Sequence, residues 1–246
     1  MKRAFDIVAA AGALVLLAPL MLLVALLTWL QDFRSPLYPG RRVGRGGRVF
    51  RMAKFRTMVV DADAAGVLST AKDDRRITPF GHVVRRWKVD ELPQLWNILR
   101  GDMSFVGPRP NVPREVALYS EAERRLLSVR PGLTDDASIV FAALPEILEG
   151  SLDPNRDYNR LVRPWKSRLG LYYVATGSVA TDLALITLTA VCLISRQAGL
   201  GGVQWLLGRT GAPPELLRIA KRAEPLVPSI PPGVTAETWA HHLTYH

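Results

Sequence analysis

The sequence is poor in cysteine, since Cys192 is the only one in 246 residues. One cysteine cannot form an intramolecular disulfide, so the fold must be stable without one, which suits a reducing compartment such as the cytosol. The sequence also lacks an internal repeat. At this length the chain can form one ordinary domain with its own core, plus an anchor or a tail, whereas two full domains would be cramped.

Acidic residues are outnumbered by basic ones. The chain has 32 Lys and Arg against 22 Asp and Glu, a formal net charge of +10. Asp6 and Asp32 are the only acids in residues 1–60, which carry ten basic residues and therefore +8 of the total. This balance indicates an acidic partner: nucleic acid, an anionic membrane surface or a phosphorylated substrate.

Charge is absent from Ile7 to Leu30, a run of 24 residues. Because about 20 residues cross a bilayer, this run predicts a membrane segment. A cleaved signal peptide is the alternative, since Lys2 and Arg3 precede the run. The length of the run, and Ala-Pro-Leu-Met at residues 18–21 where a cleavage site would lie, favour the membrane segment.

Pro19 lies in the middle of this run and predicts a kink or a break, because it removes a backbone hydrogen bond at a cost of about 3 kcal/mol. Basic residues flank the run on both sides, and basic flanks prefer the cytoplasmic side. A helix that enters and returns satisfies both flanks, whereas a spanning helix satisfies one. The residues alone leave both topologies open.

Basic and apolar residues alternate around three glycines in residues 41–58, RRVGRGGRVFRMAKFRTM. This pattern predicts a β-hairpin near lipid headgroups, with a solvated basic turn as the plainer alternative. Residues 61–82 predict loop and short helix, ended by Thr-Pro-Phe-Gly at 78–81. Residues 112–129 predict one helix, ended by Arg-Pro-Gly at 130–132.

Toward the C-terminus, residues 183–195 form a 13-residue uncharged stretch. It is too short to span a bilayer comfortably, so it predicts a buried helix or one in the membrane plane. Prolines are frequent from Gly208 onward and break up any long element. We therefore expect residues 201–246 to be a partly disordered, Pro-rich extension.

An acidic pair, Asp90-Glu91, stands in the segment KVDELPQLWNILRGDMSFVGPRP. With Asp90 as the N-cap, residues 91–93 fill the first helical turn, where Pro93 costs nothing, and Gly101 ends the helix. Apolar residues at helical spacing predict the buried face: Leu92, Leu95, Trp96 and Leu99. The polar residues Asp90, Gln94 and Asn97 share another face.

An ordinary helix cap is one interpretation of Asp90. Two features favour chemistry instead. Cations are spread along the segment: Arg85, Arg86, Lys88 and Arg109. A helix N-terminus also presents unpaired N–H groups suited to phosphate. Cations and a helix dipole would keep Asp90 ionised, leaving a carboxylate able to hold a divalent metal and to attack phosphorus.

Three motifs occur in order: KFRTM at 54–58, DELPQLWNILRGDMSFVGPRP at 90–110 and RPGLT at 130–134. With them, residues 1–195 resemble the bacterial sugar transferase family, the monotopic polyprenol-phosphate phosphoglycosyl transferases that start surface-glycan assembly, in its small form with only a catalytic domain. The resemblance implies that Asp90 attacks the sugar-linked phosphate of a nucleotide diphosphosugar and expels the nucleoside monophosphate. Polyprenol phosphate then attacks the phosphosugar-aspartyl intermediate.

The resemblance also implies a Mg²⁺ ion at Asp90 and Glu91, with Glu91 either a metal ligand or an orienting group. Arg109, in the Pro-Arg-Pro turn, would hold phosphate through two parallel hydrogen bonds. Arg85 and Lys54 are further phosphate-binding candidates. As alternatives, Lys54 and its neighbour Arg56 could bind lipid headgroups, and Arg85 could pair with a surface acid.

For the N-terminus the resemblance implies a re-entrant helix-break-helix with both ends in the cytosol. Its break is usually a Ser-Pro pair, and here Ala18 precedes Pro19, which leaves a freed carbonyl without the serine hydroxyl. Another departure is Asp135-Asp136 after Thr134, where many members have glycine. Sugar preference is therefore not carried over.

Together these features predict a helix-rich α+β fold: a re-entrant membrane helix at 1–33, a catalytic domain at 34–200 with a small hairpin and membrane-plane amphipathic helices, and the extension at 201–246. We expect the bacterial inner membrane as location, with the catalytic domain facing the cytosol. The expected partners are a nucleotide diphosphosugar (with UDP as the expected nucleotide), polyprenol phosphate and membrane lipids, but not nucleic acid, and the sequence leaves open whether a second copy joins in a homodimer.

A binding protein is the rival hypothesis. A tethered protein could grip anionic lipid or nucleic acid through its basic stretch, with Phe50, Phe55 and Trp87 stacking on bases and Asp90 as a plain cap. No named nucleic-acid motif occurs in the sequence. The two hypotheses differ for Asp90→Asn, which would abolish an enzyme but would change a cap little.

Overall fold

The computed structural model describes residues 2–62, 74–236 and 239. It is a helix-rich α+β fold with two small sheets, as predicted. The elements of the first half are α1 (Lys2–Leu30), β1 (Leu37–Val43), β2 (Val49–Phe55), α2 (Pro79–Arg86), α3 (Gln94–Arg100), β3 (Ser104–Val106), α4 (Pro113–Ala117) and α5 (Glu121–Arg124). Those of the second half are β4 (Gly132–Thr134), α6 (Asp136–Val140), α7 (Leu144–Ile147), α8 (Pro154–Asp157), α9 (Arg163–Thr176), α10 (Val179–Ile194), α11 (Arg196–Arg209) and α12 (Pro214–Lys221).

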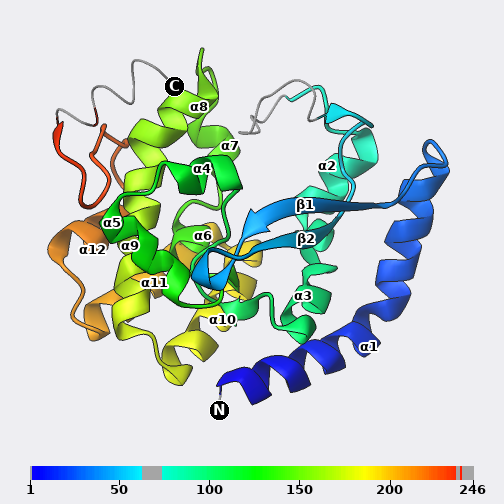
Figure 1. The fold of residues 1–246 in the computed structure, drawn as a ribbon, viewed down its shortest axis with the longest axis horizontal. Helices are drawn as coiled ribbons and strands as arrows, with labels where there is room; N and C mark the ends of the chain where they lie inside the picture. Colours follow the sequence, from blue (N-terminus) through cyan, green and yellow to red (C-terminus); the bar gives the residue numbers. More distant parts are fainter. Residues whose placement is uncertain (1, 63–73, 237–238, 240–246) are drawn as a thin grey trace.

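Helix α1 is continuous from Lys2 to Leu30, with Pro19 inside it. Its ribbon curves around one side of the molecule, next to α3 and the hairpin (Figure 1). Among the described residues it is the one helix long and apolar enough to cross a membrane. The predicted break is thus a change of direction within one continuous helix.

The predicted hairpin is confirmed. Strands β1 and β2 pair antiparallel, with Leu37 opposite Phe55 and Val43 opposite Val49. The turn between them needs glycine, because Gly46 and Gly47 have φ values of 66° and 78°. Strand β3 pairs with β4 in parallel, which brings the segment after residue 106 next to the segment after residue 134.

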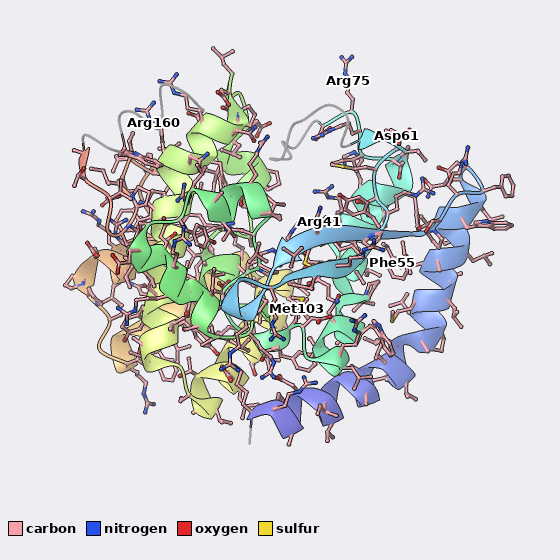
Figure 2. The ribbon with its side chains drawn as sticks, viewed as in Figure 1. Arg41, Phe55, Asp61, Arg75, Met103 and Arg160 are labelled. Atoms are coloured by element: carbon pink, nitrogen blue, oxygen red, sulfur yellow. The ribbon has the colours of Figure 1, made fainter. Side chains whose placement is uncertain are left out.

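The apolar core has three parts. The largest lies among α6, α9, α10, α11 and α12. In the other two, successive parts of α1 pack on the domain: Ala10 lies in one cluster with Leu95, Ile98 and Met103, and farther along Val24 lies in another with Phe55 and Val84. Figure 2 labels Phe55 and Met103 in the region between the hairpin and α1.

Two local predictions are wrong. Residues 78–81 start a helix rather than end one, because Thr78 Oγ1 accepts the Gly81 N–H at 3.0 Å and Pro79 occupies the first turn of α2. Residues 112–129 form α4, α5 and a short 3-10 helix instead of one helix. Most of the loop predicted before residue 78 lies outside the described residues, since 63–73 are not described.

The C-terminal extension is more ordered than expected. The predicted boundary at residue 200 falls inside α11, and Val203, Leu207 and Leu216 are buried in the largest core. Within the extension, residues 201–209 and 214–221 are therefore helical, and partial disorder elsewhere in the tail stays a prediction. The uncharged stretch 183–195 lies in α10, with Leu185 fully buried and Ile194 90% exposed.

Candidate active site

The acidic pair does not cap a helix. Residues Val89–Glu91 form a 3-10 turn, entered through Lys88 at φ 57°, and α3 begins only at Gln94. Lys88 occupies the N-cap position of this turn, and Asp90 lies inside it. The prediction of Asp90 as an N-cap is therefore wrong, because the tight turn closes with Glu91 N–H to Lys88 O at 3.1 Å before Pro93, which has no N–H to donate. The predicted stop at Gly101 is confirmed, with φ 93°.

Helix α3 buries its polar side. Gln94 and Asn97 are 0% and 2% exposed, whereas Trp96, predicted to be buried, is 54% exposed. The Asn97 side chain accepts the Ala53 N–H at 2.8 Å and donates to Arg51 O at 2.9 Å. These bonds pin β2 against α3 and so bring Lys54 to the acidic pair.

Glu91 lies between two cations. Its carboxylate accepts from both terminal nitrogens of Arg109, with Nη1 at 3.2 Å from Oε2, and Lys54 Nζ lies 3.1 Å from Oε1. Burial alone would raise the pKa of Glu91, but the charges of Arg109 and then Lys54 hold that pKa well below its usual range. Burial lowers the pKa of Lys54 and the charge of Glu91 opposes this. Glu91 thus fixes both cations in place.

Asp90 differs from its neighbour. It is 7% exposed, its Oδ2 lies 3.9 Å from Lys54 Nζ, and its buried Oδ1 has no hydrogen-bond partner among the described residues. Burial raises the pKa of Asp90, against the attraction of Lys54. The sequence predicted that cations and a helix dipole would favour the ionised form of Asp90. In the structure, burial disfavours that form and is the larger effect. A poorly solvated carboxylate with a free oxygen is reactive toward an electrophile.

Of the predicted cations, only some reach the acidic pair. Arg85, in the last turn of α2, is partly exposed, and in the described part of the chain it has no hydrogen bond or ion pair; its charge still lowers the pKa of Asp90. Lys54 faces Glu91 rather than the lipid. Arg56 is bound by Asp32 and by Ser35 O. The structure therefore brings Lys54 and Arg109 to the pair and leaves Arg85 at its edge.

Sequence reasoning missed a second group of charges beyond Arg109. Burial lowers the pKa of Lys166 to about 8, helped by the charge of Arg109 and opposed by Asp135 and Glu115. Lys166 Nζ lies 5.2 Å from the centre of the Tyr158 ring. Asp135, 2% exposed, caps α6 by accepting the Ser138 N–H at 2.7 Å. The one sequence signal for this group was Asp135-Asp136, which stands where many family members have glycine. No sequence pattern indicated that Lys166 lies near the site.

The carboxylates of Asp90 and Glu91 could supply only part of the ligands of a magnesium ion. No group of three or more His, Cys, Asp or Glu residues is close enough to share a metal in the part of the chain that the structure describes. Asp90 offers a free oxygen, but Glu91 is occupied by Arg109 and Lys54. Mg²⁺ commonly takes one or two carboxylates and completes its shell with substrate phosphates and water, so Asp90 fits that role best.

Known proteins resemble this chain over most of its length. A model of the bacterial sugar transferase family matches residues 1–196. The exopolysaccharide production protein ExoY of Sinorhizobium fredii is 36% identical over 209 residues, covering 78% of this chain and 85% of that protein. The undecaprenyl-phosphate glucose phosphotransferase of Komagataeibacter xylinus is 40% identical over 196 residues, 76% of this chain and 35% of that protein.

The UDP-galactose-lipid carrier transferase of Erwinia amylovora is 39% identical over 149 residues, 54% of this chain and 31% of that protein. The family match spans the acidic pair, Lys54, Arg109 and α1 together. The chain therefore belongs to the bacterial sugar transferase family.

Proposed function

We propose that this protein is a phosphoglycosyl transferase that moves a sugar 1-phosphate from a UDP-sugar to polyprenol phosphate, through a phosphosugar intermediate on Asp90. The observation that carries the proposal is the buried Asp90 carboxylate with an unpartnered oxygen, beside two cations that share one counter-charge. The names of the relatives from Komagataeibacter xylinus and Erwinia amylovora support the acceptor and the donor.

The reaction has two displacements. A carboxylate oxygen of Asp90 bonds to the sugar-linked phosphorus, the bond from that phosphorus to the bridging oxygen breaks, and UMP leaves with the electron pair. A phosphate oxygen of the polyprenol phosphate then bonds to the same phosphorus, and the bond to Asp90 breaks. The carboxylate is regenerated, so the cycle needs no added energy source.

Arg109 and Lys54 supply positive charge where the phosphates bind. The guanidinium can offer phosphate two parallel hydrogen bonds, and the lysine amine acts as a point charge. Glu91 holds both in advance, which lowers the cost of ordering them when the donor arrives. We assign Glu91 the orienting role, since its two oxygens are already bound.

A magnesium ion belongs to this proposal. When bound it would neutralise phosphate charge and so reduce the repulsion met by an anionic nucleophile. Asp90 would supply the available carboxylate ligand, with substrate phosphates and water completing the shell, while Glu91 keeps its contacts with Arg109 and Lys54.

The contacts of α1 support a re-entrant topology. At its start, Arg3 donates to Leu99 O at 2.8 Å, and just past its end Asp32 pairs with Arg56. Both ends therefore contact the same domain, which a helix crossing the bilayer away from the domain would not allow. Exposed Trp87 and Trp96 on the neighbouring turn and helix suit the headgroup region. We propose that the domain lies on the cytosolic face of the inner membrane.

Cysteine labelling tests the topology. With Cys192 replaced by serine, a cysteine at Ser35 or directly after Met1 should be protected in intact cells from an impermeant reagent and labelled after lysis. Labelling of the N-terminal cysteine from outside would contradict re-entrance.

The rival binding hypothesis loses two of its observations. Asp90 does not cap a helix, and Phe55 is 4% exposed, so it cannot stack on a base. An assay of the purified protein with a panel of UDP-sugars and undecaprenyl phosphate tests the transferase. We expect UMP release that depends on one or a few of the sugars, and no release with any sugar would refute the proposed function.

A further inference from the structure

Groups from four elements meet at the start of α1. The Lys2 ammonium donates to Val106 O at 2.9 Å, to the Tyr173 hydroxyl at 2.7 Å and to Asp182 Oδ2 at 2.6 Å. The Tyr173 hydroxyl donates to Asp182 Oδ1 at 2.5 Å. We call the Lys2, Tyr173 and Asp182 side chains with the Val106 carbonyl the Lys2 clamp.

Every donor in the Lys2 clamp is used. An ammonium has three N–H groups, and each has an acceptor, while both oxygens of Asp182 are bound. Tyr173 and Asp182 are 7% and 6% exposed. Burial and the bond to Asp182 raise the pKa of Tyr173, so its hydroxyl keeps its proton. The Lys2 side chain is 39% exposed, but its partners are buried, and a fully satisfied network of this kind favours one geometry.

The Lys2 clamp binds β3 at the edge opposite β4. One edge of β3 pairs with β4, and among the described residues no strand pairs with the other. At that second edge, polar side chains of α1 bind the backbone of β3: Asp6 Oδ1 accepts the Phe105 N–H at 3.2 Å, and Lys2 donates to the Val106 carbonyl. Val106 ends β3, and Arg109 follows three residues later. The clamp thus fixes the strand that leads into the Arg109 turn.

The same turn of α1 also touches the other side of the site. Arg3 donates to Ile98 O at 2.5 Å and to Leu99 O at 2.8 Å, near the end of α3. Helix α3 follows the turn that carries Asp90 and Glu91. The N-terminal turn of the membrane helix therefore spans the two segments whose relative position sets the contact between Glu91 and Arg109.

We propose that Lys2, Tyr173 and Asp182 are positioning residues for Arg109, so that the enzyme grips its donor only when the start of α1 is seated on the domain. This inference rests on the proposed function, in which Arg109 holds donor phosphate. It assigns no chemistry to the clamp itself, whose nearest link to the substrate is the backbone between residues 106 and 109.

Steady-state kinetics of Lys2→Met test this role. We expect kcat/KM for the UDP-sugar to fall roughly 10- to 100-fold, the range for a small misplacement of a substrate-positioning group, while KM for polyprenol phosphate stays at the wild-type value. Lys2→Arg should recover most of the loss, because arginine can reach the same carbonyl and carboxylate. Lys221→Met, which removes an exposed lysine from α12, is the matched control and should behave as wild type.

A double-mutant cycle separates positioning from general damage. If Lys2 acts through Arg109, Lys2→Met should cost little further activity once Arg109→Ala has been made. Equal losses in the two backgrounds would overturn the proposal. Tyr173→Phe, which removes only a hydroxyl, serves if Lys2→Met does not fold, and it should show the same loss that vanishes with Arg109→Ala.

Hydrogen exchange supplies a readout that does not need activity. Amides of residues 105–107 and 109 should exchange faster in Lys2→Met and Tyr173→Phe than in wild type or Lys221→Met, by a larger factor than the amides of α11 in the same protein, which report any general loss of stability. Unchanged exchange there would refute the positioning role even if no UDP-sugar is turned over. A wild-type protein that is inactive but shows the expected exchange would refute only the proposed function.

Discussion

Replacing Glu91 by glutamine tests the residue that holds Arg109 and Lys54, the two cations proposed to bind phosphate. The substitution keeps the size of the side chain and removes the single negative charge shared by Arg109 and Lys54. The side chains of Glu91, Lys54 and Arg109 are 12%, 21% and 31% exposed. Both cations would therefore stay largely out of water, with Lys54 left only with Asp90 at 3.9 Å and Arg109 with Leu133 O at 3.4 Å.

The expected loss follows from this burial. Removing one member of a buried ion pair costs roughly 3 to 5 kcal/mol, and the partial exposure of Arg109 places this case near the lower limit. For a chain of this size, each kcal/mol shifts the melting temperature by about 2 to 4 °C, so Glu91→Gln should melt roughly 6 to 12 °C below wild type at pH 7. Turnover should also fall, because Arg109 loses its paired contact.

The difference in melting temperature between wild type and Glu91→Gln should depend on pH, in a direction that the pKa of Glu91 fixes. The pKa of Glu91 is held below the ordinary value of 4.5 in the folded protein. Its stabilisation is therefore complete above that pH, and it is lost as the pH falls from there toward the folded pKa. The difference in melting temperature between wild type and Glu91→Gln should be full at pH 7 and should narrow below pH 4.5.

Thermal melting in detergent, with UMP release measured in parallel, checks this prediction. The control is Glu215→Gln, which neutralises a 54% exposed glutamate that lies 3.9 Å from Arg168 and should change the melting temperature little. If Glu91→Gln melts with wild type and keeps its turnover, the orienting role assigned to Glu91 is refuted.

Three further predictions concern the same site. Asp90→Asn should lose UMP release yet melt at or above the wild-type temperature, because it removes a buried charge with an unpartnered oxygen; a clear fall in melting temperature would contradict this. Arg109→Lys should raise KM for the UDP-sugar, since lysine cannot make two parallel hydrogen bonds, and unchanged KM would count against phosphate binding there. The Lys166 amine, whose pKa burial lowers to about 8 near Arg109, adds positive charge to the region proposed to bind phosphate, so activity should decline as the pH rises through about 8; the decline should be absent in Lys166→Arg, and its persistence would exclude Lys166 as the cause.

Much of the fold could be predicted because its signals are local. The charge-free run gave α1, and the alternation around the glycines gave the hairpin. Two errors were also local and could have been avoided. Ser120 and Glu123 form a capping box that starts α5 inside the predicted helix, and Thr78-Pro79 is a helix start.

The site was predictable only in part. Asp90, Glu91, Lys54 and Arg109 came from the resemblance, and the structure brings these four together. The backbone conformation around these residues could not be predicted from helix propensity. Helix α3 begins only after Pro93, and tertiary packing buries Asn97, whose side-chain amide hydrogen-bonds to β2. Lys166 and the Lys2 clamp join residues far apart in the chain, and no local pattern predicts such contacts.

The mechanism requires that Asp90 carry the sugar phosphate during turnover. The most direct measurement is mass spectrometry of protein incubated with its UDP-sugar in the absence of polyprenol phosphate and quenched in acid. The account predicts a mass increase of one sugar phosphate on the peptide that contains Asp90, and its loss when polyprenol phosphate is added before the quench. Recovery of the adduct on another side chain, or continued turnover with no adduct at all, would contradict it.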